Sequence, residues 1–181
     1  MAERPPNTFL IALAAVLMST APMSAQPTGL KGTLLAIYTR TLAAMEAART
    51  PADIDRTVDA MDTADWTSVD ADGTRMTRDD AKRQLTRSLN GPAAPQPAIQ
   101  LLWVTQAGES ATAVAWVFAK SQLVDAAGEY GPKGARHQVL VGALIRDSWT
   151  MTKQGWRRRM HEKIFPNRVI AVDGKSIVSP L

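Results

Sequence analysis

The chain has 181 residues, of which 45% are hydrophobic and 21% charged, with a net charge of +4. This balance is typical of a globular protein and excludes the low-hydrophobicity, high-charge class of disordered chains. The sequence has no cysteine, which excludes disulfides, a lipid anchor on cysteine, a thiol nucleophile and cysteine-based zinc sites. We therefore expect a fold that its hydrophobic core alone stabilises.

The N-terminal segment has the pattern of an export signal. The apolar run Thr8–Met18 has 11 residues, fewer than the roughly 20 that a membrane-spanning helix needs, and small residues follow it. A polar start, an apolar middle and a small-residue exit are typical of a secretory signal peptide. We predict cleavage after Ala25, which leaves residues 26–181 as a single domain, periplasmic or secreted and without a membrane span. Cleavage after Ala21 and a buried N-terminal helix are the alternatives.

Three helices are predicted in the first half of the chain. Residues 33–50 contain no proline or glycine and are rich in Ala and Leu, which favours a helix. Residues 50–53 (Thr-Pro-Ala-Asp) supply a cap, a first-turn proline and an acceptor for free N–H groups, so a second helix begins there. Residues 77–80 (Thr-Arg-Asp-Asp) form a capping box that starts a third helix.

The rest of the chain is predicted to form strands. A short strand at 66–69 turns at 70–73, and 90–97, with one glycine and three prolines, is a connector within one domain. Longer strands are expected at 98–107, 111–124, 136–152 and 156–165, followed by shorter ones at 169–172 and 176–178. Strands of 14 to 17 residues exceed the usual length of about 5 to 6 and should be strongly bent. The sequence thus predicts an α+β fold, in which a curved antiparallel sheet packs on three N-terminal helices and encloses a cone.

The hairpin turning at 153–155 predicts which side chains share a face. The predicted cross-strand pairs are Met151 with Trp156, Trp149 with Arg158, Asp147 with Met160, and Ile145 with Glu162. Because side chains alternate along a strand, all eight project to one face, which is the more apolar one. The opposite face would carry Arg146, Ser148, Arg157, Arg159, His161 and Lys163. His161 therefore points away from the predicted cavity, unless a one-residue slip or a bulge reverses it.

Asp147, Glu162 and Arg158 are the candidate catalytic residues on this face. A partly desolvated carboxylate of Asp147 or Glu162 would have a raised pKa and could act as a base. Arg158 or Tyr38 would then stabilise developing negative charge. A structural ion-pair network is the competing interpretation, and we favour it because such networks also perturb pKa values.

Large apolar side chains could line a ligand pocket. The candidate ligand-binding residues are Tyr38, Trp66, Trp103, Trp149, Trp156 and Met160. Core packing is the alternative for aromatic rings. The run Asp70–Gly73 lacks the further ligands of a calcium loop, so no metal and no cofactor is predicted. The basic strand lacks interleaved aromatic residues, which disfavours nucleic-acid binding.

The element order resembles that of the nuclear transport factor 2-like superfamily, and more narrowly its exported SnoaL-like or ketosteroid-isomerase-like branch. The segments that carry the resemblance are the acidic turn at 66–73, Asp147-Ser-Trp149, Gly155-Trp156-Arg157 and Val172-Asp173-Gly174-Lys175. The resemblance covers residues 30–178. It implies a curved sheet closed by helices over a deep apolar pocket, and members that include isomerases, dehydratases, cyclases, hydrolases and non-catalytic binding domains. The fold does not choose among these functions.

Three functions follow, in order of preference. The first is binding of a small apolar or amphipathic molecule without catalysis. The second is a cofactor-free acid–base enzyme of the isomerase or dehydratase type. The third is a dimeric interaction module whose basic strand contacts an acidic partner. Binding ranks above catalysis because the predicted face lacks an inward set of Asp, His and Tyr; a homodimer is expected in any case.

Overall fold

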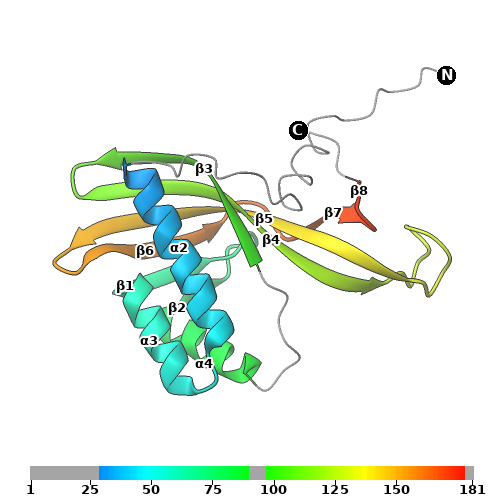
Figure 1. Cartoon of the computed structure of the whole chain (residues 1–181), viewed down its shortest axis with the longest axis horizontal. Helices are drawn as coiled ribbons and strands as arrows, with labels where there is room; N and C mark the ends of the chain where they lie inside the picture. Colours follow the sequence, from blue (N-terminus) through cyan, green and yellow to red (C-terminus); the bar gives the residue numbers. More distant parts are fainter. Residues whose placement is uncertain (1–28, 90–96, 178–181) are drawn as a thin grey trace. The chain divides into compact units, whose positions relative to one another are not determined.

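The computed structural model describes residues 29–89 and 97–177 (Figure 1). The predicted signal peptide and its cleavage site lie outside these residues, as does most of the predicted connector. The described residues form two compact units. The helical unit contains residues 29–89, 97–119 and 142–167, and the β unit contains residues 120–141 and 168–177. The single mature domain remains a prediction. No helix within the described ranges is long and apolar enough to cross a membrane.

The helical unit begins with the three predicted helices: α2 (Gly29–Ala47), α3 (Pro51–Met61) and α4 (Arg78–Ser88). The predicted capping box of α4 is present, and the predicted cap at Thr50 is also part of a capping box. The Thr50 side chain accepts a hydrogen bond from the Asp53 amide at 3.3 Å, and Thr77 accepts from the Asp80 amide at 3.2 Å. In each box the aspartate side chain accepts from the backbone N–H of the capping threonine. The starts of α3 and α4 are therefore fixed locally by short-range hydrogen bonds.

The main path of the sheet, which β7 (Arg168–Val172) joins by pairing with β5, consists of β1 (Asp62–Val69), β2 (Arg75–Thr77), β3 (Pro97–Ala107), β4 (Ser110–Val124), β5 (Arg136–Thr152) and β6 (Gly155–Lys163). These strands lie in the order β2-β1-β6-β5-β4-β3, and the two end strands do not pair with each other, so the curved sheet is not closed. The prediction of a wholly antiparallel sheet is wrong at one place, because β1 pairs with β6 in parallel. The chain enters β1 directly from α3, and the tight turn at 70–74 then leads into antiparallel β2.

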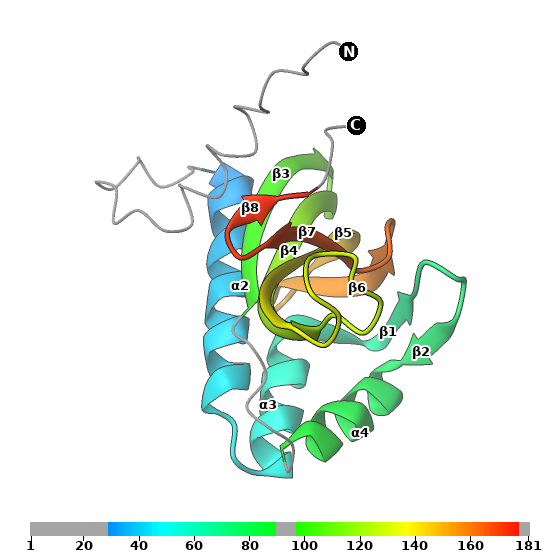
Figure 2. The same cartoon turned by 90° about the vertical axis from the view of Figure 1, so that its right-hand side faces the viewer.

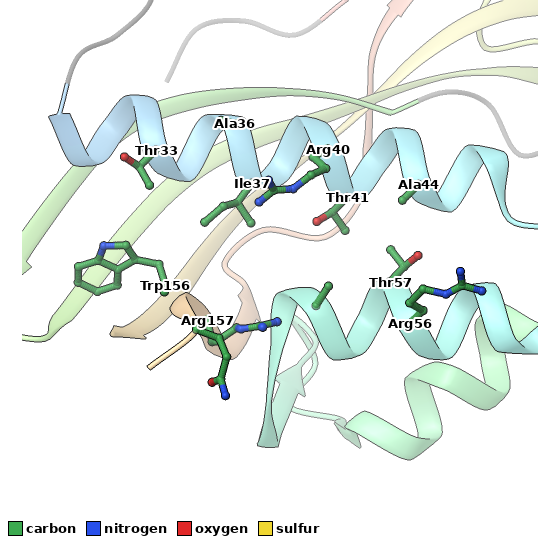
Figure 3. A pocket seen from close by; sticks show the side chains of 13 residues that line it. Thr33, Ala36, Ile37, Arg40, Thr41, Ala44, Arg56, Thr57, Trp156 and Arg157 are labelled. Atoms are coloured by element: carbon green, nitrogen blue, oxygen red, sulfur yellow. The ribbon is translucent and has the colours of Figure 1, made fainter. Parts of the chain in front are cut away.

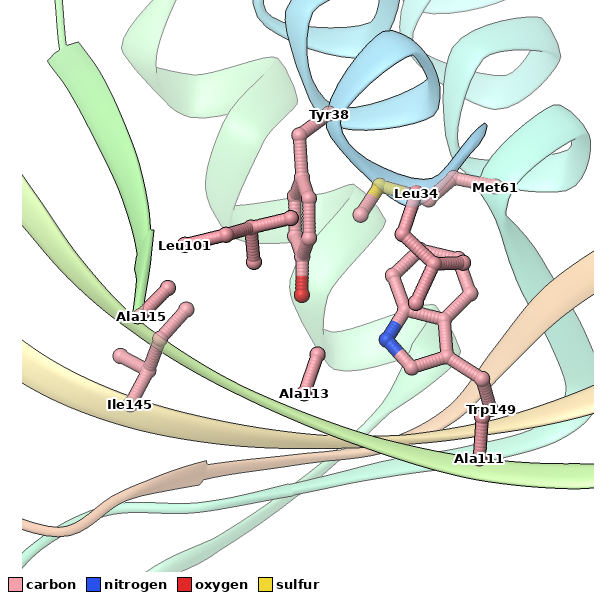
Figure 4. Packing of buried hydrophobic residues seen from close by; sticks show 9 residues of the cluster. All are labelled: Leu34, Tyr38, Met61, Leu101, Ala111, Ala113, Ala115, Ile145 and Trp149. Atoms are coloured by element: carbon pink, nitrogen blue, oxygen red, sulfur yellow. The ribbon is translucent and has the colours of Figure 1, made fainter. Parts of the chain in front are cut away.

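The core of the helical unit lies between α2 and the sheet. Figure 4 shows its nine buried members: Leu34, Tyr38, Met61, Leu101, Ala111, Ala113, Ala115, Ile145 and Trp149. Three alanines at alternate positions of β4 present small side chains toward α2, as the two-residue period of a strand requires. The Tyr38 ring meets the Trp149 ring edge-on, with centroids 5.2 Å apart. Figure 2 shows α2 running beside β3, where the Lys31 Nζ donates to the Leu102 carbonyl at 3.1 Å.

The β unit contains the end of β4, the start of β5, and the short strands β7 (Arg168–Val172) and β8 (Lys175–Ser176). Asp125 organises its loop, because the carboxylate accepts from the amides of Gly128, Glu129 and Tyr130 at 2.7, 2.9 and 2.7 Å. The predicted turn between β7 and β8 is confirmed, and Asp173 in it has φ of +47°. Its carboxylate is 2.7 Å from Nδ1 of His137.

Candidate functional site

A group of ionisable side chains lies beneath the sheet of the helical unit. We call it the buried polar cluster; its members are Tyr38 of α2, Asp62 of β1, Asp147 of β5, and Arg158 and His161 of β6. Asp147 is 0% exposed, Tyr38 4% and Asp62 6%. Burying charges is costly unless they are paired and hydrogen-bonded, so the contacts of this cluster decide what it can do.

A β-bulge brings the cluster together. Trp149 pairs with Arg158, but the preceding Ser148 pairs with Met160, so Arg159 is an extra residue without a partner on β5. A bulge of this kind shifts the alternation of side chains on one strand relative to the other. Arg158 and His161 consequently lie on the same face as Trp149 and Asp147.

The predicted register is therefore right near the turn and wrong beyond the bulge. The pairs Met151 with Trp156 and Trp149 with Arg158 are confirmed. Asp147 lies opposite His161 instead of Met160, and Ile145 lies opposite Lys163 instead of Glu162. The prediction that His161 points away from the core is wrong for the same reason.

Glu162 is on the other face of the sheet. The Arg146 guanidinium donates to its carboxylate at 2.8 and 2.6 Å, and the Arg146 side chain is 48% exposed. Met160 pairs with Ser148, which alternates with the inward Asp147, so Met160 also lies on that outer face. Neither residue reaches the cluster that contains Asp147 and Arg158.

Asp147 is the centre of the cluster. Its Oδ1 lies 2.7 Å from Nδ1 of His161, its Oδ2 accepts a hydrogen bond from the Tyr38 hydroxyl, and Nη1 of Arg158 is 3.6 Å from Oδ2. Nη1 of Arg158, a donor, also lies 3.4 Å from Nδ1, but the contact of Nδ1 with Asp147 is much shorter. An ionised carboxylate can only accept, so this shorter contact assigns the hydrogen of His161 to Nδ1 and the free lone pair to Nε2. Within the described residues no hydrogen bond to Nε2 is found, and the His161 side chain is 22% exposed. The imidazole thus extends from the buried carboxylate toward the surface.

The charges around Asp147 keep it ionised. Burial alone would raise the pKa of its carboxyl, but the Arg158 charge, then the His161 contact and the Tyr38 hydroxyl, hold that pKa below its ordinary value. Burial, and then the neighbouring Asp147 carboxylate, raise the pKa of Tyr38 well above its ordinary value. Tyr38 therefore stays protonated and serves as a hydrogen-bond donor.

Arg158 connects Asp147 to a second carboxylate. Its Nε and Nη2 donate to the two oxygens of Asp62 at 2.8 and 3.2 Å, a bidentate pair. Burial alone would lower the pKa of Arg158, but Asp147 and Asp62 raise it. The pKa of Asp62 is raised by burial despite Arg158. The guanidinium also lies 5.3 Å from the centre of the Trp66 ring, within the range of a cation–π contact.

Asp62 and Asp147 carry two negative charges and Arg158 carries one positive charge, so these three side chains together have a charge of −1 beside His161.

The predicted ligand-binding residues are dispersed. Tyr38 and Trp149 are packed in the core, and Trp66 is 5% exposed beneath Arg158. Trp156 lines a groove between α2 and α3. Trp103 of β3 is 53% exposed, and Met160 is on the outer face.

Sequence reasoning missed Asp62 and the inward direction of His161. Asp62 directly follows the buried Met61 at the end of α3, and that position was the signal available for it. Nothing marks the bulge at Arg159, since no glycine or proline lies within the run from Trp156 to Phe165. Within the described ranges, no group of three or more His, Asp or Glu side chains could hold a metal ion.

No protein-family model and no curated protein sequence matches the chain. Solved structures share its fold. The Kfla4162 protein from Kribbella flavida is 20% identical with a TM-score of 0.51, over 74% of this chain and 91% of that one. An NTF2-like protein from Cytophaga hutchinsonii is 10% identical with a TM-score of 0.51, over 75% of this chain and 98% of that one. An NTF2-like protein with a cystatin-like fold from Novosphingobium aromaticivorans is 15% identical with a TM-score of 0.50, over 86% and 87%.

These similarities confirm the predicted fold class. The chain has the α+β fold of the nuclear transport factor 2-like superfamily, in which three helices accompany a curved, unclosed sheet. Identities of 10 to 20% show the fold and carry nothing about activity. The function has to be argued from the cluster itself.

Proposed function

We propose that this protein is a cofactor-free acid–base enzyme that takes a proton from a small organic molecule, with His161 as the base. The observation that carries the proposal is the 2.7 Å hydrogen bond between Nδ1 of His161 and Oδ1 of the fully buried Asp147. An aspartate in this position holds the imidazole in one tautomer and stabilises the imidazolium that forms. The basic nitrogen, Nε2, is then available to a substrate.

The lowered pKa of Asp147 moves the role of base from the carboxylate to the histidine. A carboxylate that Arg158 and Tyr38 keep ionised is a weak proton acceptor near neutral pH, but it is a strong orienting group. Arg158 and Tyr38 are accordingly positioning residues that act through Asp147. Glu162, the other candidate base from the sequence, has no part in the proposal, because it lies on the outer face with Arg146.

Binding of a small molecule without catalysis is the second candidate. It is favoured by the groove between α2 and α3 that Trp156 lines, since the rings of Tyr38 and Trp149 occupy the space beneath the sheet where the sequence predicted an open pocket. In that case the buried polar cluster has only a structural role, which is to fix the arrangement of side chains in the core. The two candidates differ in whether Nε2 of His161 takes up a proton from a bound molecule.

A general carbon-acid probe separates the candidates without knowledge of the substrate. In 5-nitrobenzisoxazole a base removes the ring proton on carbon, the N–O bond breaks, and a coloured cyanophenolate forms. We expect turnover above the buffer rate, and a loss of about 100-fold in His161→Gln, the lower end of what a positioned general base contributes. Glu162→Gln, one residue away on the outer face, is the matched control and should keep the wild-type rate. Equal rates for wild type and His161→Gln would leave binding as the function.

Export and dimerisation belong to the proposal as well. Export rests on the signal-peptide pattern of residues 1–25, and a homodimer is expected from the resemblance to the superfamily. N-terminal sequencing of protein recovered from outside the cytoplasm should begin at Gln26. Sedimentation of the purified protein should give twice the mass of one mature chain.

A further inference from the structure

A groove lies on the helical unit, away from the members of the buried polar cluster. Its volume is about 780 Å³, and its walls are α2, α3 and the turn that leads into β6 (Figure 3). This volume lies within the range of about 300–1,000 Å³ that small-molecule sites occupy. None of the five cluster residues lines it.

The groove combines an apolar floor with polar walls. Ile37 of α2 and Trp156 of β6 are partly buried and pack against the core cluster, so their outer surfaces form the floor. Alanines of α2 and α3 widen it, because they present only methyl groups. Threonines of α2 and α3 line the same walls, and the hydroxyls of Thr33 and Thr57 donate to carbonyls of their own helices. A molecule with an apolar body of one or two rings, or of a medium-length alkyl chain, fits such a surface.

Three arginines and no carboxylate line the groove. They are Arg40 of α2, Arg56 of α3 and Arg157 of β6, and Figure 3 shows all three around the same space. Arg40 has no ion-pair partner within residues 29–89 and 97–177. Arg157 is fixed by one N–H, which donates to the Asp59 carbonyl at 2.7 Å, and keeps its other donors. Arg56 is 3.1 Å from Asp53 at the surface.

Asp55 and Asp59, two carboxylates on α3, do not neutralise this basic wall. Lys82 of α4 lies 2.6 Å from Asp59 and 3.5 Å from Asp55, and Arg78 also pairs with Asp59. The acidic side of α3 is therefore matched by the cations of α4. Its other side, with Arg56 and Thr57, faces the groove. Since Asp53 pairs with Arg56, the uncompensated positive charge of the wall comes from Arg40 and Arg157.

We propose that this groove binds a small amphipathic anion, whose apolar body lies on Ile37 and Trp156 and whose carboxylate, sulfonate or phosphate group meets Arg40 and Arg157. Guanidinium groups recognise such anions through paired N–H donors. The site is separate from the buried polar cluster, and the inference does not depend on catalysis by His161.

Two fluorescent probes with almost the same ring system test the proposal on the purified protein. 8-Anilinonaphthalene-1-sulfonate carries a negative charge, and N-phenyl-1-naphthylamine lacks it. We expect one molecule of the sulfonate probe to bind per chain, with energy transfer from Trp156 and with competition by decanoate. The neutral probe should bind at least about 10-fold more weakly, because it lacks one charge-assisted hydrogen bond. Equal affinity for the two probes would overturn the proposal.

Arginine variants locate the site. Arg40→Gln and Arg157→Gln should each weaken sulfonate binding by about 10-fold. Arg87→Gln on α4 and Arg159→Gln on β6 are the matched controls, because they remove the same charge outside the groove and should leave affinity unchanged. If all four variants behave alike, the probe binds elsewhere and the proposal is wrong. If neither probe binds, and Arg40→Glu instead dissociates a dimer, the groove is an interface between copies and the proposal is also wrong.

Discussion

The sequence contains two histidines, and each is held by an aspartate through Nδ1 at 2.7 Å, one in each unit. In the helical unit the carboxylate of Asp147 is fully buried, and the ring of His161 reaches the surface. In the β unit the Asp173 side chain is 54% exposed, and the His137 ring is only 10% exposed. The Nε2 of His137 is buried without a hydrogen-bond partner among the described residues, 4.0 Å from Asp125.

The two pairs make the same contact, so under the proposed function a hydrogen-bonded Asp–His pair is not by itself a functional site. What matters is which end of the pair is in water. A buried carboxylate with an accessible imidazole can orient a base and stabilise its charge, as in the pair of Asp147 and His161. An exposed carboxylate with a buried imidazole, as in Asp173 and His137, ties two strands together. The buried pair should therefore control stability and proton transfer, and the exposed pair should control neither strongly.

The largest expected difference is in the cost of removing each carboxylate charge. Asp147→Asn should lower the free energy of unfolding by about 3–5 kcal/mol, because Arg158 is left in the interior with one partner fewer. Asp173→Asn should cost no more than about 1 kcal/mol, since the Asp173 carboxylate is at the surface and Asn tolerates its positive φ. Urea denaturation of both variants measures the difference. Similar losses would mean that the two pairs do the same structural work.

The next effect concerns the hydroxyl that donates to Asp147. Tyr38→Phe should lower the free energy of unfolding by about 1.5–3 kcal/mol, the range for a hydrogen bond to a charged group. Tyr130 packs edge-on against His137 in the β unit, with ring centroids 6.5 Å apart, and Tyr130→Phe should change stability by less than about 0.5 kcal/mol. A Tyr38→Phe protein as stable as wild type would contradict the account of the cluster.

The two units also show which parts of the fold and of the cluster could be predicted from the sequence. Helix starts at 50–53 and 77–80 were predictable, because a capping box is complete within four residues. The register next to the turn, from Met151 and Trp156 to Trp149 and Arg158, was predictable because the hairpin fixes it. Beyond Arg159 a single extra residue moved every later side chain of β6 to the other face, so His161, Met160 and Glu162 were all misplaced.

The features that the sequence did not predict share a physical cause. A bulge without glycine or proline leaves no local pattern, and its position depends on how β6 pairs with both β5 and β1. The parallel partner β1, which carries Asp62, could not be derived from alternation within one hairpin. The inward set of Asp, His and Tyr, whose absence had ranked binding above catalysis, is a consequence of these long-range pairings.

A smaller effect is expected on the stability of the fold in acid, which should fall as the pH is lowered. The pKa of Asp147 is held below its ordinary value of 3.8 in the folded protein. A carboxyl with a depressed folded pKa stabilises the fold above its unfolded pKa and loses that contribution as the pH falls through the folded pKa. Stability should therefore decline below about pH 4, and Asp147→Asn should show a shallower decline there. Thermal unfolding at pH 2 to 5 checks this, and an unchanged slope would exclude Asp147 as a cause.

The smallest effect is expected on the outer face. Glu162→Gln removes a surface ion pair with Arg146 and should cost about 0–1 kcal/mol. The same variant serves as the control for His161→Gln in the proton-transfer assay. A large loss of stability in Glu162→Gln would mean that the register beyond Arg159 is the one without the bulge.

The most direct test of the account is the position of the proton on His161. Nitrogen-15 NMR of protein labelled at its two histidines reports the tautomer of each ring, and a His137→Gln variant assigns the signals. The account predicts that neutral His161 carries its hydrogen on Nδ1, bonded to Asp147, with Nε2 unprotonated. A neutral ring with its hydrogen on Nε2 would contradict the orientation on which the proposed proton transfer depends.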